Sequence, residues 1–149
     1  MDSLTVEKYY PQVLSLLSSS MVILTKYYNW STIPIIGENI LSSSISIGAT
    51  WAGFGGTIMG LLLTIPKEKI ITGLITSHYI DDLHHYVYRS ITSSIVFSFV
   101  SLFLFFFENN VDPFGVINAV WLGVCVYAAL CFYRASSIIY KVMKLYHRP

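Results

Sequence analysis

Long stretches without a charged residue constrain this chain more than any other feature. A helix needs about 20 apolar residues to cross the hydrocarbon core of a membrane, with a usable range of roughly 17 to 25. Runs of 17, 28, 18 and 21 uncharged residues lie, in that order, between Lys8 and Lys26, Glu38 and Lys67, Arg89 and Glu108, and Asp112 and Arg134. The chain is therefore expected to be an all-α polytopic membrane protein.

Composition agrees with this class. Charged residues make up 11% of the chain, less than half of the roughly 25% usual in soluble proteins, and hydrophobic residues make up 54%. The length of 149 residues suits a single transmembrane domain spanning 1–149. Cys125 and Cys131 both lie in an apolar run on different helix faces, which predicts buried thiols and neither a disulfide scaffold nor a metal motif.

Four transmembrane helices are predicted from these runs. The first is the most polar, because it contains Ser15 and the triplet Ser18 to Ser20, and a helix lying on the membrane surface is the alternative there. The predicted spans cover about residues 11–28, 40–65, 90–107 and 113–133.

Basic residues predict the orientation, because Lys and Arg in short loops are retained on the cytoplasmic side. With four spans, eight of the nine basic residues fall on one side and only Lys26 on the other. Both termini, the loop 66–89 and the basic tail 134–149 are therefore expected in the cytoplasm. We expect an integral protein of the bacterial inner membrane, in contact with membrane lipid.

Small residues recur every four positions along the second predicted span. A strip with so little side-chain volume lets another helix approach closely, and such strips drive helix association in lipid. We expect the protein to form a homo-oligomer through this strip. The alternative is that the strip packs against another helix inside the monomer. The predicted packing residues are Ser44, Gly48, Ala52, Gly56 and Gly60.

Hydroxyl residues form a second pattern, with a spacing of seven in the second span and mostly four in the third. They are candidates for lining a water-filled path between subunits. The alternative is that each hydroxyl donates to a carbonyl of its own helix. The candidate pore-lining residues are Ser43, Thr50, Thr57, Thr64, Ser90, Ser94 and Ser98.

No Asp, Glu, Lys, Arg or His lies within the four uncharged runs. Proton relays, ion-coupled pumps and voltage sensors depend on ionisable groups at that depth, and haem ligation needs intramembrane ligands. The sequence also lacks a phosphate-binding loop, a nucleophile elbow and catalytic spacing of Cys and His. We therefore expect no enzyme activity, no catalytic residue, no cofactor and no direct binding of nucleic acid.

The loop 66–89 alternates apolar and polar residues at helical spacing, which predicts an amphipathic cytoplasmic helix between the second and third spans. His78 with Asp82 and Asp81 with His85 are four residues apart. These four side chains are candidates for docking a soluble partner. A metal site and a solvated polar face are the alternatives.

The stretch from Ile47 to Thr64, IGATWAGFGGTIMGLLLT, is followed by a basic loop and two further apolar spans. This arrangement, over about residues 39–145, resembles RexB, the small four-span membrane protein of lambda phage superinfection exclusion. At residue level the resemblance rests on Gly48 to Thr50 and on Gly56-Thr57. It implies a membrane effector of antiphage defence that dissipates the membrane potential once a cytoplasmic sensor protein detects infection.

The sequence thus predicts a non-enzymatic effector that oligomerises and permeabilises the inner membrane, gated by a cytoplasmic partner. The alternative is a structural or assembly subunit of a larger membrane complex, in which the small-residue strip packs against a different protein.

Overall fold

The computed structural model describes residues 3–28, 37–64, 79–106 and 116–146. Within these residues the protein is entirely helical, as expected. Its four helices are α1 (Ser3–Tyr27), α2 (Glu38–Thr64), α4 (Tyr79–Phe106) and α5 (Val116–Tyr146).

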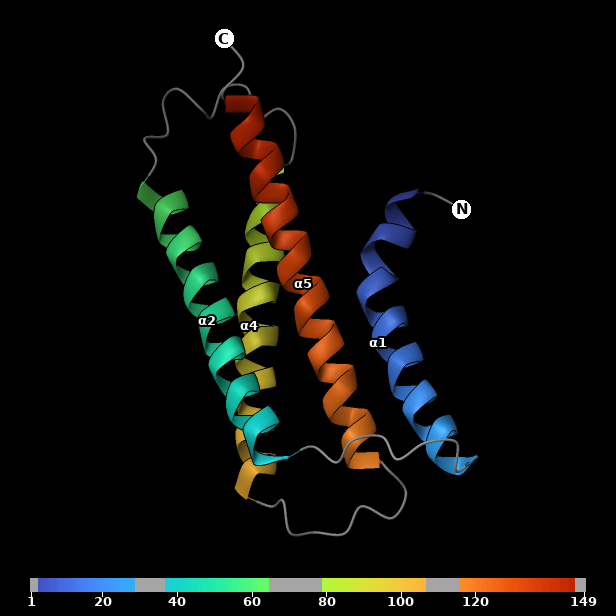
Figure 1. The fold of residues 1–149 in the computed structure, drawn as a ribbon. Coiled ribbons are helices and arrows are strands. Elements are labelled where there is room, and N and C mark those ends of the chain that lie inside the picture. The colour runs from blue at the N-terminus through green and yellow to red at the C-terminus, as the bar shows by residue number, and fades with distance from the viewer. Residues whose placement is uncertain (1–2, 29–36, 65–78, 107–115, 147–149) are drawn as a thin grey trace.

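The helices stand in an open row and alternate in direction (Figure 1). In space α2 lies along α4, α4 along α5 and α5 along α1, whereas α2 meets α5 at only a few positions. Along the helix axes, α1 begins and α5 ends at the same end of the bundle, at the top of Figure 1. We call this the terminal end of the bundle. Because the four successive helices alternate in direction, the chain returns to the end of the bundle at which it started.

Local sequence explains where α2 begins and ends. The carbonyl oxygen of Gly37 accepts hydrogen bonds from the backbone N–H groups of Ile40, at 2.9 Å, and Leu41, at 3.1 Å, which closes the first turn. The helix ends at Thr64, two residues before Pro66 in the sequence. Proline lacks a backbone N–H and disfavours the helical conformation of the residue before it, so the helix stops there.

Among the described residues, two helices are long and apolar enough to cross a membrane: α4 over Leu83–Phe106, with 24 residues, and α5 over Val116–Tyr140, with 25. Only 28% and 22% of their most apolar windows are buried, so neither resembles the enclosed core helix of a soluble protein. The serines of α1 make it the least apolar of the four helices, whereas α2 is on average at least as apolar as α4 and α5 despite its glycines and hydroxyl residues.

The helices of the third and fourth predicted spans, α4 and α5, extend beyond the uncharged runs. Residues 79–89, expected in the amphipathic loop helix, are the first turns of α4, and residues 134–146 of the predicted tail continue α5. Residues 66–78 and 147–149 lie outside the described residues.

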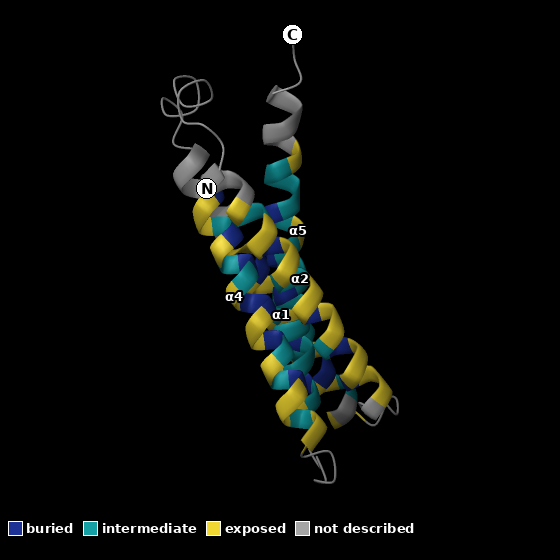
Figure 2. Cartoon of the chain, turned by 90° about the vertical axis from the view of Figure 1, so that its left-hand side faces the viewer, coloured by how far each residue is buried: buried dark blue, intermediate teal, exposed yellow. Residues whose placement is uncertain are grey.

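Two clusters hold α2, α4 and α5 together. Leu83, Val87 and Ala135 form a buried apolar cluster nearer the terminal end. Further along, the Trp51 ring stacks against Phe132 of α5, with centroids 5.2 Å apart, and against Phe97 of α4, at 6.4 Å. Buried residues follow the lines where helices meet, and exposed residues cover the outer faces (Figure 2).

Candidate functional site

The face of α2 that packs against α4 repeats every seven residues. Leu41, Gly48 and Gly55 are all buried. A spacing of seven rotates by only about 20° around a helix, so these positions keep facing the same neighbour along the whole contact.

Gly48 is the closest approach in this interface. A Cβ atom built there would overlap Ser98 Oγ and lie 3.0 Å from the carbonyl oxygen of Ser94 and 3.2 Å from Phe97 Cδ1. Ser98 Oγ in turn donates a hydrogen bond of 3.3 Å to the carbonyl oxygen of Ile45. Absence of a side chain at position 48 is therefore what lets α4 come close enough to bond α2.

The predicted packing strip turns away from this interface along the helix. Ser44 and Gly48 are buried, Ala52 is half-buried, and Gly56 and Gly60 are exposed, with nothing within 4 Å of a Cβ built at either. A spacing of four advances by about 40° per step, so the strip winds around α2 instead of following α4. Its first half packs inside the monomer and its second half is open.

The exposed side of α2 consists of small residues over most of its length. We call this surface the small-residue face: all nine of its members are exposed, and each is Gly, Ala, Ser or Thr. They are Ser42, Ser43, Ser46, Ala49, Thr50, Gly53, Gly56, Thr57 and Gly60. Another helix can therefore approach the α2 backbone along this face without steric hindrance.

Four of the five hydroxyl groups on the small-residue face donate to their own helix. Thr50 Oγ1 donates to the carbonyl oxygen of Ser46 at 2.8 Å, and Thr57 Oγ1 donates to that of Gly53 at 3.0 Å. Ser43 and Ser46 make the equivalent bonds four residues back. Each oxygen keeps acceptor capacity toward the outside, while its proton is already engaged.

The candidate hydroxyls of α4 do not join those of α2. Ser90 and Ser94 are buried inside the monomer, and Ser98 is half-buried against α2. Ser94 donates to the carbonyl oxygen of Ser90 at 2.8 Å, and Ser90 Oγ is buried without a hydrogen-bond partner. The two sets therefore lie on different surfaces of the monomer. The side chain of Thr64 lies outside the described part.

The candidate docking residues are described only in part. His85 is exposed on the first turns of α4, with its ring centroid 6.1 Å from that of Tyr86. Asp81 and Asp82 belong to the same helix, but their side chains, and all of His78, lie outside the described residues. Among the described side chains no group of three or more His, Cys, Asp and Glu gathers as a metal site would require.

Two arginine–tyrosine pairs join α4 to α5, and the sequence interpretation missed both. Arg89 Nε of α4 donates to the Tyr127 hydroxyl of α5 at 2.7 Å. Reciprocally, an Arg134 nitrogen of α5 donates to the Tyr86 hydroxyl of α4 at 2.8 Å, and its guanidinium lies over the Tyr86 ring at 4.1 Å. The sequence signal is an arginine at the edge of the third and of the fourth uncharged run, which also predicts orientation.

These features define a helical protein with two helices of membrane-crossing length and an open small-residue face on a third. No family model, no curated protein and no solved structure matches the chain. The resemblance to RexB therefore stays a prediction.

Proposed function

We propose that the protein is a non-enzymatic membrane effector whose copies assemble through the small-residue face of α2 and permeabilise the inner membrane. One observation carries this proposal: the small-residue face, which is exposed from Ser42 to Gly60, contains no bulky side chain, and Ile47 and Phe54 lie at its edge. Lipid tails gain little from such a surface, because van der Waals contact with it is sparse, whereas a second helix gains close backbone packing.

The proposal includes four spans with both termini in the cytoplasm. Hydroxyl groups of α1 support a membrane location for this helix, because Ser20 and Thr25 donate to carbonyl oxygens of their own helix and leave no free donor toward lipid. Basic residues support the orientation. Arg89 lies in the half of α4 nearer the terminal end, and Arg134 and Lys141 lie in the corresponding half of α5, whereas Lys26 lies at the opposite end of the bundle, where α1 ends.

The proposed effector is gated by a cytoplasmic partner that docks on the first turns of α4. His85 is exposed on the turns of α4 that lead to the terminal end, where a soluble partner could reach it if that end is cytoplasmic. The resemblance to RexB supplies the kind of partner, a cytoplasmic sensor of infection. The proposed setting is therefore antiphage defence in a bacterial inner membrane.

Assembly and leakage can be tested together in liposomes that contain a self-quenched dye. Purified wild type should form cross-linkable oligomers and release dye. Gly56→Leu should remain monomeric and release little, because Leu fills the small-residue face at a position where an added Cβ atom meets nothing within 4 Å.

Ser20→Leu is the matched control, since it adds a side chain of the same size at an exposed position of α1. It should assemble and leak like wild type. Oligomers of normal size from Gly56→Leu would refute assembly through this face, and oligomers of wild type that never leak would refute permeabilisation.

A second function is favoured by the hydroxyl bonds. Because Thr50 and Thr57 already donate to their own backbone, the small-residue face also suits dry packing against a different protein, as in a structural or assembly subunit of a larger complex. In that case the protein co-purifies with a different membrane protein, Gly56→Leu breaks that complex, and the purified chain neither self-associates nor leaks.

A further inference from the structure

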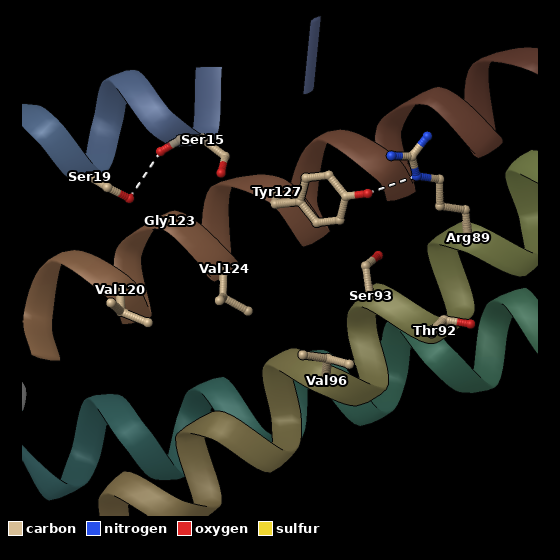
Figure 3. A pocket seen from close by; sticks show the side chains of 10 residues that line it. All are labelled: Ser15, Ser19, Arg89, Thr92, Ser93, Val96, Val120, Gly123, Val124 and Tyr127. Carbon is tan, nitrogen blue, oxygen red and sulfur yellow. Dashed lines mark hydrogen bonds between the residues drawn. The ribbon is translucent and has the colours of Figure 1, made fainter. Parts of the chain in front are cut away.

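A groove separates α1 from α4 where both flank α5 (Figure 3). It arises because α1 packs on α5 alone among its major contacts. Its volume of about 400 Å³ falls within the range of roughly 300 to 1,000 Å³ typical of ligand sites.

Gly123 holds α1 close to α5 beside this groove. A Cβ atom built at Gly123 would overlap Ser19 Oγ and lie 3.6 Å from the carbonyl oxygen of Ser15. The close approach keeps α1 in place along the groove, so that the gap toward α4 has a fixed wall on each side.

The two ends of the groove differ in chemistry. Arg89 and Tyr127 lie at one end, and Val96, Val120 and Val124 lie further along (Figure 3). Gly123 and four hydroxyl residues complete the lining, and the hydroxyls of Ser19, Thr92 and Ser93 donate to carbonyl oxygens of their own helices. Nε of Arg89 is held by the Tyr127 hydroxyl at 2.7 Å, and no hydrogen bond from its other nitrogens is present within the described residues. Arg89 is therefore a positioned cation with donors to spare.

The length of α4 indicates where Arg89 would lie relative to a membrane. From Arg89 to Phe106 α4 rises about 26 Å at 1.5 Å per residue, close to the roughly 30 Å of a hydrocarbon core. If α4 spans, Arg89 lies near one boundary of the core, where its guanidinium can reach the phosphate layer. The valines then lie at the depth of acyl chains.

We propose that this groove binds one anionic phospholipid, with its phosphate on Arg89 and an acyl chain along Val96, Val120 and Val124. Charge complementarity selects this occupant: a single cation at headgroup depth, continued by an apolar slot, matches an amphiphile with an anionic head. The inference rests on the membrane location in the proposed function, but not on assembly or leakage.

Native mass spectrometry of the purified protein in detergent tests the proposal, with phosphatidylglycerol and phosphatidylcholine added in equal amounts. Wild type should retain phosphatidylglycerol about fivefold or more over phosphatidylcholine, the preference expected for one arginine at the phosphate layer. Arg89→Gln should lose this preference, and Arg89→Lys should keep most of it. Equal preference in wild type and Arg89→Gln would overturn the proposal.

Arg134→Gln is the control for charge, because Arg134 belongs to the other arginine–tyrosine pair and does not line the groove. It should retain the preference. Val96→Trp fills the slot from an exposed position and should lower retention of both lipids while Arg89 is intact. Circular dichroism should show unchanged helix content in every variant.

Chain-free glycerol phosphate distinguishes a lipid from a small anion. It should fail to displace phosphatidylglycerol, and displacement by it would refute a lipid site. Loss of dye release with the lipid preference intact would refute only the proposed function. Absence of lipid preference in a protein that assembles and leaks would refute only the lipid site.

Discussion

At the scale of single residues, two glycines of α2 have opposite surroundings although both belong to the same four-residue pattern. Gly48 is enclosed by Ser98, Ser94 and Phe97, whereas Gly56 has open space around it. The sequence alone does not distinguish them, because a glycine contributes no hydrophobic signal and its role depends on which way the helix faces.

Substituting alanine at these two positions should therefore have different effects on stability. Gly48→Ala forces Ser98 and the α4 backbone away and should cost about 1 to 3 kcal/mol of unfolding free energy. Gly56→Ala meets nothing and, with its higher helix propensity, should be neutral or stabilising by up to about 1 kcal/mol. Unfolding in mixed micelles, followed by circular dichroism, measures both. Equal losses at the two positions would contradict the interface described for α2 and α4.

The reciprocal arginine–tyrosine pairs give a second prediction at residue scale. Tyr86→Phe removes the hydrogen-bond acceptor of Arg134 and keeps the ring, so it should cost about 0.5 to 1.5 kcal/mol in the same unfolding measurement. Tyr133→Phe, at an exposed neighbouring tyrosine, is the control and should change stability little. A loss of similar size in both variants would show that the Arg134 bond contributes nothing specific.

At the scale of elements, the sequence predicted helices well and their partners less well. Long uncharged runs fix where helices can form, and Pro66 predicts the end of α2. Which helices meet depends on pairs such as Arg89 with Tyr127, 38 residues apart, and Arg134 with Tyr86, 48 residues apart. No local pattern encodes such pairs, because they depend on the relative rotation of two helices.

The hydroxyl row of α2 gives a prediction at this scale. Thr57→Ala removes a side chain whose proton already bonds within its own helix, so the helix and its assembly should be kept. If Thr57 borders water in the oligomer while the glycines of the small-residue face make the helix contact, the rate of dye release should change because an acceptor oxygen is lost. Cross-linking and dye release, measured on one preparation, separate the two effects. Loss of the oligomer in Thr57→Ala would contradict a role limited to lining.

At the scale of the whole molecule, the all-helical class follows from the sequence, and two helices of crossing length are present in α4 and α5. The other two predicted spans depend on α1, whose serines lower its hydropathy, and on α2, which is on average at least as apolar as α4 and α5. The candidate site was predictable only in part: the small residues of α2 were identified, but their division into a buried and an exposed side needed the position of α4.

With four spans, the terminal end of the bundle should face the cytoplasm and the opposite end should face the other side of the membrane. In a chain with Cys125 and Cys131 replaced by alanine, Tyr140→Cys should react with an impermeant maleimide only after the inner membrane is opened. Tyr27→Cys should react in intact spheroplasts, because α1 ends at the end of the bundle opposite the terminal end. Both tyrosines are exposed, so access within the monomer is equal in kind. Labelling of both cysteines from one side would contradict the four-span arrangement.

The paired arginines and tyrosines also limit how this protein can move. A shift of α4 past α5 by one helical turn, about 5.4 Å, would break both hydrogen bonds at once, because the two pairs point in opposite directions between the helices. A third bond, from Trp121 Nε1 of α5 to Ser101 Oγ of α4 at 3.0 Å, joins the two helices where α4 ends and α5 begins. Sliding and tilting of α4 against α5 are thereby both disfavoured, so these two helices should move together as one unit.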